Sequence, residues 1–388
     1  MPRPLPRLFR RGLLLGALLA VTACGPRGGG FTFPGIAPPI GGAVAPMPAD
    51  MPRVRGAMLL PLTGGQAPLG QAMLNAGTMA LFDEAGQGIE FAPQDTNGTP
   101  TGAATAARRA IAGGARILVG PLTSAETAAV APVARNAGVP LLAFTNDASR
   151  AGEGVWVLGV TPAQQVRRLV AASAAGGAQR FALGAPDNEF GRALAAALRE
   201  ATQDLGLPRP VIGLYPAGAD VTMAAAALRS QAAQAEALLI GETGERARRY
   251  VAAYQAAEGE GGPPPRLLGT ALWGTDGSLR GDPALAGAWF PGPDPGARSR
   301  FEARYRDAYG ETPPRVAAVA YDAVALGTRS LRSGAMPGST ADTLAGAEGP
   351  VRLAQGGRTL RGLAVFSLSA SGDPVLVAPA PLPGAPGS

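Results

Sequence analysis

Hydroxyl and acidic side chains follow the early apolar runs of the chain, where they could bind a small polar ligand. The stretch "VGPLTSAET" spans 119–127, and Thr123 and Glu126 have the spacing of a capping box at a helix start. A helix start offers free N–H groups, to which Thr123, Ser124 and Thr127 add hydroxyls, so this segment could receive a carboxylate. Ordinary helix caps have the same spacing and are commoner than ligand sites.

Other candidate ligand groups stand at the ends of other apolar runs. The glycines of "PLTGGQAPLG" (61–70) would let a ligand approach the backbone, whereas "DTNGT" (95–99) is typical of a turn. Further along the chain, "FTND" (144–147), "DNEFG" (187–191), "GETG" (241–244) and "GTALWGTD" (269–276) occupy equivalent places. These stretches contribute Thr63, Gly64, Thr145, Asn146, Asp147, Phe190, Glu242, Leu272 and Trp273 as candidate cleft residues. A buried aromatic more often belongs to the core, and Asn-Asp pairs also form turns.

The residue types that are missing exclude most catalytic chemistry. The sequence has no His and no Lys, and it has one Cys. A Ser-His-Asp relay, a Schiff-base amine and a His- or thiolate-based metal site therefore cannot be assembled. No GxxxxGK or GxGxxG phosphate motif occurs either. An enzyme would have to work with Asp, Glu, Tyr, Arg or Ser alone, and we expect no catalytic residues, metal or cofactor.

The charge balance argues against a nucleic-acid partner. The formal net charge is +6, but Arg3, Arg7, Arg10 and Arg11 all lie in the first eleven residues. Without these four, 30 basic residues face 28 acidic ones, so the rest of the chain is nearly neutral. No run of Arg interleaved with aromatics is present.

The first 23 residues are typical of a secretion signal. Four Arg precede the apolar run 12–23, which is too short for a bilayer that takes about 20 residues to cross. A core helix with a buried Cys24 is the alternative. Residues 24–52 are rich in Gly and Pro and predict a tether with a reach of about 30 Å. Residues 379–388 predict a disordered tail.

From residue 55 onward, short apolar runs alternate with amphipathic stretches. This alternation predicts parallel sheets covered by helices, and the number of repeats favours two α/β lobes over one. Thr161-Pro162 is a good start for the helix after the run 155–160. The later order of helices and then strands indicates that the chain crosses between the lobes more than once. The expected strands are 56–62, 89–95, 116–120, 139–144, 155–160, 180–186, 210–216, 237–241, 351–355, 363–369 and 374–379. The expected helices include 103–112, 124–136, 222–233, 296–309 and 315–333, and one that begins at Glu242.

The end of the leader resembles a bacterial lipoprotein signal. Val21, Thr22, Ala23 and Cys24 stand where the lipobox has Val or Leu at −3, a small residue at −1 and Cys at +1. The resemblance implies that Cys24 is acylated and anchors the mature chain to a membrane. Gly25 stands in place of the Asp that retains many lipoproteins at the inner membrane, which implies the outer membrane.

The folded part resembles the leucine/isoleucine/valine-binding branch of the type I periplasmic binding proteins. The motifs are "PLTG", "VGP", "GVPLLAF", "FGRAL" and "AYDAVAL" (320–326), and the resemblance covers about 55–378. It implies an α/β fold with two Rossmann-like lobes joined by three crossovers and a ligand between the lobes. The expected lobe 1 is 53–159 plus about 287–338, and the expected lobe 2 is 160–286 plus about 345–378.

The resemblance implies ligand-binding roles for several residues of this sequence, and at one position this sequence differs from the family pattern. It puts Ser124 and Thr127 near the carboxylate-binding Ser/Thr cluster, residues 145–147 near the second ligand loop, and Phe190 at the aromatic before Gly. Family members that bind amino acids commonly have an acidic residue in the region of "GTALWGTD", where this chain has Leu272 or Trp273. The departure weakens the case for amino-acid binding, unless the charge comes from Asp187, Glu189 or Glu242.

These observations support two alternative functions. "LLGTALWGTD" (267–276) and the stretch 285–310 resemble penicillin-binding-protein activators, which are lipoproteins that dock onto a cell-wall synthase. The first expectation is therefore a non-catalytic periplasmic lipoprotein that activates a penicillin-binding protein. The alternative is the solute receptor of an ABC permease for an amino acid or a similar small polar ligand.

Overall fold

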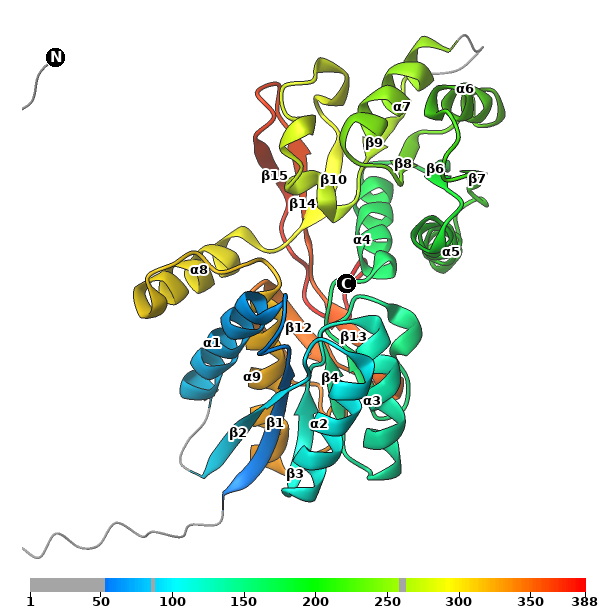
Figure 1. The fold of residues 1–388 in the computed structure, drawn as a ribbon. Helices are drawn as coiled ribbons and strands as arrows, with labels where there is room; N and C mark the ends of the chain where they lie inside the picture. The colour runs from blue at the N-terminus through cyan, green and yellow to red at the C-terminus, as the bar shows by residue number, and fades with distance from the viewer. Residues whose placement is uncertain (1–52, 85–87, 258–262) are drawn as a thin grey trace, which may run out of the picture. The chain divides into compact units, whose positions relative to one another are not determined.

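The computed structural model of the protein describes residues 53–84, 88–257 and 263–388 (Figure 1). The predicted secretion signal, the lipobox with Cys24 and the whole tether (24–52) lie outside the described residues. Residues 50–388 form a compact unit of their own, and the fold below is the fold of this unit. Among the described residues, no helix combines the length and the apolar character needed to cross a membrane.

Lobe 1 is built on a five-stranded parallel sheet with the order β2-β1-β3-β4-β5. Four βα steps produce it, as the alternation of apolar runs predicted. The strands are β1 (Val54–Leu60), β2 (Ile89–Asp95), β3 (Ala115–Val119), β4 (Leu141–Ala143) and β5 (Val155–Val157). The helices between them are α1 (Ala67–Glu84), α2 (Pro100–Ala112), α3 (Ser124–Asn136) and the short η1 (Ala148–Arg150).

Strands β1, β3, β4 and β5 are largely buried, which explains their apolar runs, whereas the edge strand β2 is mostly half-buried or exposed. In β1, Ala57 and Leu59 pack into one cluster, with α2 and α3 residues. Met58 and Leu60 pack into another, because side chains alternate along a strand. Helix α9 (Ala317–Ser333) supplies much of the second cluster and packs along α1.

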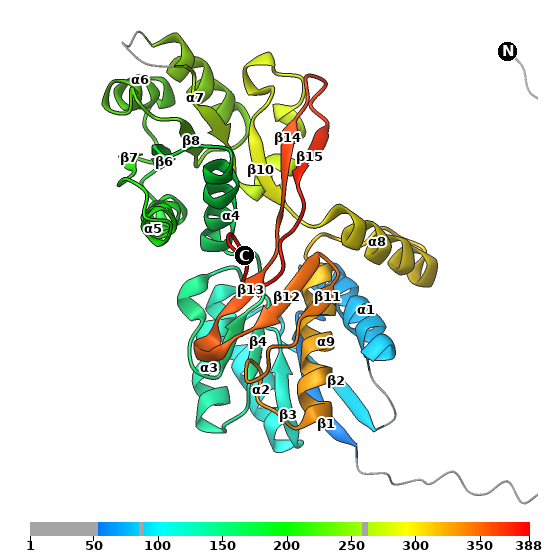
Figure 2. The ribbon, with the colours of Figure 1, turned by 180° about the vertical axis from the view of Figure 1, so that it is seen from behind.

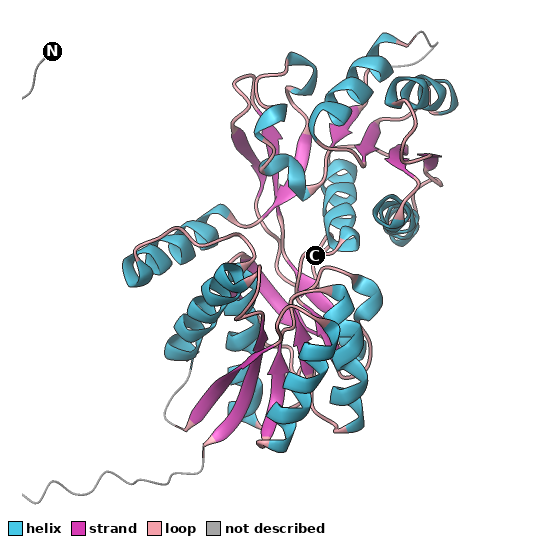
Figure 3. Ribbon diagram, in the orientation of Figure 1, coloured by secondary structure: helices cyan, strands magenta, loops and turns pink. Residues whose placement is uncertain are grey.

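Lobe 2 is built on a seven-stranded sheet with the order β15-β14-β10-β9-β8-β6-β7. Strands β6 to β10 run parallel, and β14 and β15 add an antiparallel hairpin at one edge (Figure 3). The strands are β6 (Phe181–Pro186), β7 (Val211–Tyr215), β8 (Ala237–Ile240), β9 (Arg266–Leu268), β10 (Trp289–Gly292), β14 (Ala364–Leu368) and β15 (Pro374–Ala378). The helices are α4 (Pro162–Ala175), α5 (Glu189–Asp204), α6 (Val221–Gln231) and α7 (Gly244–Ala256), with short turns η2 (Ala271–Gly274), η3 (Gly277–Leu279) and η4 (Pro283–Leu285).

The chain passes between the lobes three times, as expected. It crosses from β5 to α4, from β10 to α8 (Pro295–Tyr309), and from a small antiparallel sheet to β14. That sheet consists of β11 (Leu344–Gly346), β12 (Gly349–Leu353) and β13 (Thr359–Arg361), with η5 (Gln355–Gly357) between its last two strands. The α/β fold of two lobes with largely parallel sheets is confirmed.

The helix starts follow the cap residues in the sequence. Thr123 and Glu126 form a reciprocal capping box at α3, and Thr161 and Gln164 form another at α4. Helix α7 begins at Gly244 rather than at Glu242, so Glu242 precedes the helix.

The expected lobe boundaries differ from the observed ones in three places. Strand β10, expected in lobe 1, pairs with β9 and β14 in lobe 2. Strands β11 and β12, of which β12 was expected in lobe 2, pack Leu344, Val351 and Leu353 into the lobe 1 core. Residues 379–388, expected to be disordered, follow a defined path along α4 with Ser388 buried. Apolar runs show where strands are but carry no information on which sheet they join.

Candidate functional site

Ser124, the first residue of α3, is the centre of a polar cluster in lobe 1. Its hydroxyl donates to Asp147 Oδ2 at 2.5 Å. Arg150 lies over both groups, with its Nε 2.9 Å from Ser124 Oγ and 3.0 Å from Asp147 Oδ2. The hydroxyl predicted to receive a ligand carboxylate therefore already faces a carboxylate of the chain itself.

Asp147 is held as a carboxylate. Burial acts to raise its pKa, but hydrogen bonds from Ser124 and Ser149 and the charge of Arg150 together lower the pKa below its usual value. The backbone N–H of Asp147 donates to the hydroxyl of buried Thr145 at 3.1 Å. Asn146 is exposed beside them. The structure thus brings residues 124, 145 and 147 together and adds Arg150.

The other hydroxyls of the helix start are bonded within α3. Thr123 Oγ1 donates to Glu126 Oε2 at 2.8 Å, and Thr127 Oγ1 donates to the Thr123 carbonyl at 2.8 Å. Thr127 is fully buried, and so is Glu126, whose Oε1 atom has no hydrogen-bond partner. These two threonines behave as cap and core residues, which is the ordinary role that the spacing also allowed.

Thr63 belongs to a separate exposed cluster at the end of β1. Its hydroxyl lies 2.6 Å from Asp95 Oδ2 and 2.9 Å from Asn97 Oδ1, while Gly64 is exposed next to it. Asp95 also accepts from the Leu62 N–H at 2.9 Å. The sequence indicated only a turn at 95–99, yet this turn supplies the partners of Thr63.

Glu242 is the centre of the polar cluster in lobe 2. It is buried, and its Oε1 accepts from Tyr215 at 2.9 Å and from Arg246 Nη2 at 2.8 Å. Burial, and then the neighbouring Glu242 charge, raise the pKa of the Tyr215 hydroxyl. Because Arg246 neutralises Glu242, this carboxylate has little attraction left for a ligand ammonium group.

The candidate aromatics of lobe 2 belong to its core. Trp273 is 1% exposed, and its Nε1 donates to the Glu242 carbonyl at 2.9 Å. The indole lies against Gly269, where a Cβ atom would come within 2.0 Å of the ring. Phe190 is half-buried against the core between α4 and α5, whereas Leu272 is exposed. Trp273 therefore has no exposed ring face on which a ligand could stack.

A buried ion pair that the sequence reasoning missed fixes the third crossover. Arg361 Nη1 lies 2.8 Å from Asp322 Oδ2, and both side chains are fully buried. Arg361 Nη2 also donates to the Leu158 carbonyl at 3.2 Å, which ties the first crossover to the third. Burial raises the pKa of Asp322, and the Arg361 charge opposes this. The signal was Asp322 inside the apolar motif "AYDAVAL".

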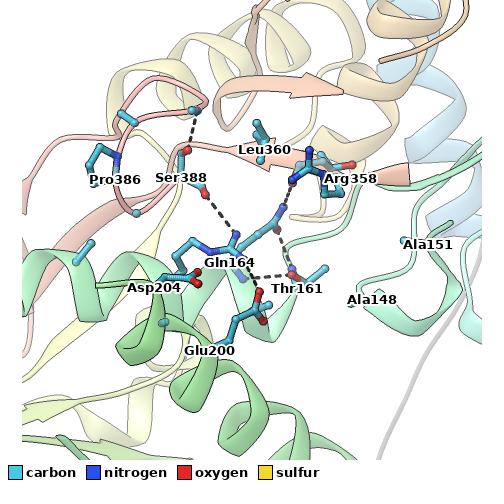
Figure 4. Close-up of a pocket in the computed structure, with 18 of the residues that line it drawn as sticks. Ala148, Ala151, Thr161, Gln164, Glu200, Asp204, Arg358, Leu360, Pro386 and Ser388 are labelled. Carbon is cyan, nitrogen blue, oxygen red and sulfur yellow. Dashed lines mark hydrogen bonds and ion pairs between the residues drawn. The ribbon is translucent and has the colours of Figure 1, made fainter. Parts of the chain in front are cut away.

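A cavity of about 680 Å³ lies where the two lobes meet, and it contains none of the predicted cleft residues. Figure 4 shows Thr161 at the start of α4, Gln164 of α4, Glu200 and Asp204 of α5, and Ser388 around it. Gln164 Nε2 donates to the Thr359 carbonyl at 2.8 Å across this region. Among the described residues, no group of three or more His, Cys, Asp or Glu side chains could hold a metal ion.

Comparison with known families gives one match that covers most of the chain. A family model described as "Periplasmic binding protein" matches residues 54–372. No protein of curated function matches the sequence.

Solved structures share the fold at low sequence identity. A putative branched-chain amino acid ABC transporter from Rhodospirillum rubrum has a TM-score of 0.70 and 20% identity, with 84% of this chain and 100% of that chain covered. Full-length LpoA from Haemophilus influenzae has a TM-score of 0.66 and 18% identity, with 84% and 59% covered. LivJ from Streptococcus pneumoniae, in complex with isoleucine, has a TM-score of 0.56 and 17% identity, with 85% and 100% covered.

Proposed function

This chain belongs to the periplasmic binding protein family, and on that premise we propose that it is a non-catalytic lipoprotein that activates a penicillin-binding protein. Family membership implies a periplasmic location. The proposed anchor is acylated Cys24, and the proposed membrane is the outer one. The resemblance of 267–276 and 285–310 to activator sequences supports this role. LpoA shares this fold, and its name does not refer to transport. The fold is therefore also found outside proteins that are named as transport components.

The observation that carries the proposal is that the predicted ligand groups are already bonded within each lobe. On lobe 1, Asp147 occupies the hydroxyl of Ser124 and would repel the carboxylate of an amino acid. On lobe 2, Arg246 neutralises Glu242, and buried Trp273 offers no ring face. An interaction protein needs none of these groups to be free. An amino-acid receptor needs the Ser124 hydroxyl free for the ligand carboxylate and the Glu242 carboxylate free for the ligand ammonium group.

The decisive experiment measures binding of the purified protein to each purified penicillin-binding protein of the same bacterium. We expect one of them to bind and to gain glycan-polymerising activity. The cleft variant Ser124→Ala with Asp147→Asn should bind equally well, because the proposed interaction does not use the cleft residues. Binding to none of the penicillin-binding proteins would contradict the proposal. Loss of binding in the cleft variant would show that the interface includes the cleft residues.

The second candidate is an ABC receptor for a small polar solute, favoured by the fold likeness to LivJ bound to isoleucine. A thermal-shift screen with the twenty amino acids separates the two functions. A ligand at 100 times its Kd would stabilise the protein by about 2.7 kcal/mol. We expect no shift with any amino acid. A shift that disappears in the Ser124→Ala and Asp147→Asn variant would favour the receptor.

The proposed anchor has its own test. Cells expressing the protein should incorporate labelled palmitate into it, and Cys24→Ser should abolish the label. Gly25→Asp should move the labelled protein from the outer-membrane to the inner-membrane fraction. An unlabelled protein that stays in the soluble periplasmic fraction would contradict the anchor without affecting the binding experiments.

A further inference from the structure

Residues 379–388, named here the C-terminal strap, contact lobe 2 through α4. Arg168 of α4 is buried, and its Nη2 donates to the Pro379 carbonyl at 2.8 Å. At the other end of the strap, Gly387 packs so closely that a Cβ atom there would lie 2.8 Å from Ala171 Cβ. Arg167 Nη1 reaches the Ser388 carbonyl at 3.4 Å. Both ends of the strap therefore contact the same turn of α4, residues 167–171.

The same ten residues also contact the third crossover and the small sheet of lobe 1. A Cβ atom at Gly362, in the crossover, would lie 2.0 Å from the Pro381 carbonyl oxygen. A Cβ atom at Gly384 would lie 3.0 Å from Arg352 Nη2, and Arg352 belongs to β12. Since β12 packs into the lobe 1 core, the strap touches both lobes. Figure 2 shows the chain end beside α4 and β13.

One arginine joins the strap to the crossover. Besides its bond to Pro379, Arg168 donates through Nε to the Leu363 carbonyl at 2.6 Å. Its guanidinium thus holds together the two chain segments at the open end of the β14–β15 hairpin, one entering β14 and the other leaving β15. Any movement of the third crossover relative to α4 would have to break these bonds inside a buried environment, where unpaired charged donors are costly.

The strap is also stiff. Four of its ten residues are Pro, which lowers the entropy lost when it becomes ordered. Short turns tie it to itself: Gly384 N donates to Ser388 Oγ at 2.8 Å, and Ala385 N donates to the Leu382 carbonyl at 3.0 Å. Residues 384–388 also form one wall of the cavity between the lobes, which Figure 4 shows around Pro386 and Ser388.

We propose that the C-terminal strap restrains the hinge, which consists of the three crossovers between the lobes. It does so by bridging α4 of lobe 2 and β12 of lobe 1 across the third crossover. It restricts how far the two lobes move relative to each other. This inference stands independently of the proposed function, since either an activator or a receptor can have a restrained hinge.

Double electron–electron resonance on the full chain tests this restraint. Cys24→Ser removes the native thiol, and spin labels at Ala128→Cys on α3 and Ala227→Cys on α6, both exposed, report the distance between the lobes. Deleting residues 379–388 should broaden the distance distribution. Amide exchange over α4 should also become about tenfold faster, the factor expected from losing one net hydrogen bond or more. The matched control Leu382→Ala changes an exposed strap side chain and should alter neither readout.

A second variant keeps the test decisive if the shortened chain does not fold. Gly387→Val keeps the chain length but places a side chain against Ala171 at a φ of +82°, so it should expel the strap end. Folded Gly387→Val protein, as judged by its circular dichroism, should show the same broadening. Unchanged distances and unchanged exchange in this variant would overturn the proposal.

Discussion

Arg361 and Asp322 form an ion pair with a 2.8 Å contact, and neither side chain has any exposed surface. Asp322 also accepts from the Ala347 N–H at 2.7 Å, while Arg361 Nε has no hydrogen-bond partner. The pair lies between α9 and β13, so it connects the body of lobe 1 to the chain that leaves for lobe 2. Its removal is the first prediction.

Asp322→Ala should cost about 3–5 kcal/mol of unfolding free energy, because Arg361 would be left buried without its counter-charge. Urea unfolding measures the loss. The control Arg358→Ala alters an exposed arginine three residues away and should change stability by about 0.5 kcal/mol or less. The double variant Asp322→Leu with Arg361→Met should recover most of the loss. A loss of about 1 kcal/mol in the single variant would mean that water reaches the pair.

Asp147→Asn should alter how stability depends on pH. The folded pKa of Asp147 lies below its unfolded value, so its contribution is present above the unfolded pKa and is lost as pH falls through the folded pKa. We expect wild type to exceed the variant by about 1 kcal/mol near pH 7, and the difference to shrink below about pH 4. Urea unfolding at several pH values measures it. Asp187→Asn, at an exposed pair, should give a difference near zero throughout.

Gly269→Ala should destabilise lobe 2 by about 1–3 kcal/mol, because the added methyl group overlaps the Trp273 ring. Gly277→Ala is the matched control, since nothing lies within 4 Å of a Cβ atom there. Thermal unfolding and tryptophan fluorescence report both variants, and a red shift is expected only in the first. Equal stability of the two variants would show that the indole can move aside at little cost.

Tyr215→Phe should lower the unfolding free energy by about 1.5 kcal/mol, because the hydroxyl bonds to the buried carboxylate of Glu242. The comparison is Tyr254→Phe, whose buried hydroxyl has no hydrogen-bond partner. That change should be neutral or slightly stabilising, since it removes an unpaired polar atom from the core. Denaturant unfolding measures the free energy of unfolding of both variants. A large loss of stability in Tyr254→Phe would indicate a bound water at that hydroxyl.

The sequence predicts the repeating part of this fold well and its assembly less well. The apolar runs and the caps at Thr123 and Thr161 locate the strands and helices, because these signals are local. Which sheet receives β10 or β12 depends on contacts across the chain, which a run of apolar residues does not encode. For the site, Ser124 and Asp147 were both candidate cleft residues, but nothing in the sequence indicated that they bond to each other or that Arg150 contacts both.

The aromatic residues of lobe 2 also show that the sequence does not reveal which side chains pack into the core. The position of Trp273 after a strand suggested a ligand platform, yet Gly269 leaves room for the indole to pack inward. Glu242 was a reasonable acidic candidate, but Arg246 in the first turn of α7 neutralises it. Because Glu242 precedes the helix, this pairing depends on the turn at Gly244 and does not follow from helical spacing.

The division of lobe 2 among distant parts of the chain sets the order in which the protein can mature. Its sheet needs β10 and the hairpin of residues 364–378, and the lobe 1 core needs α9 and β12. During synthesis, neither lobe can be completed until nearly all of the chain has emerged. The two lobes must therefore complete their cores together, late in translation, rather than one after the other.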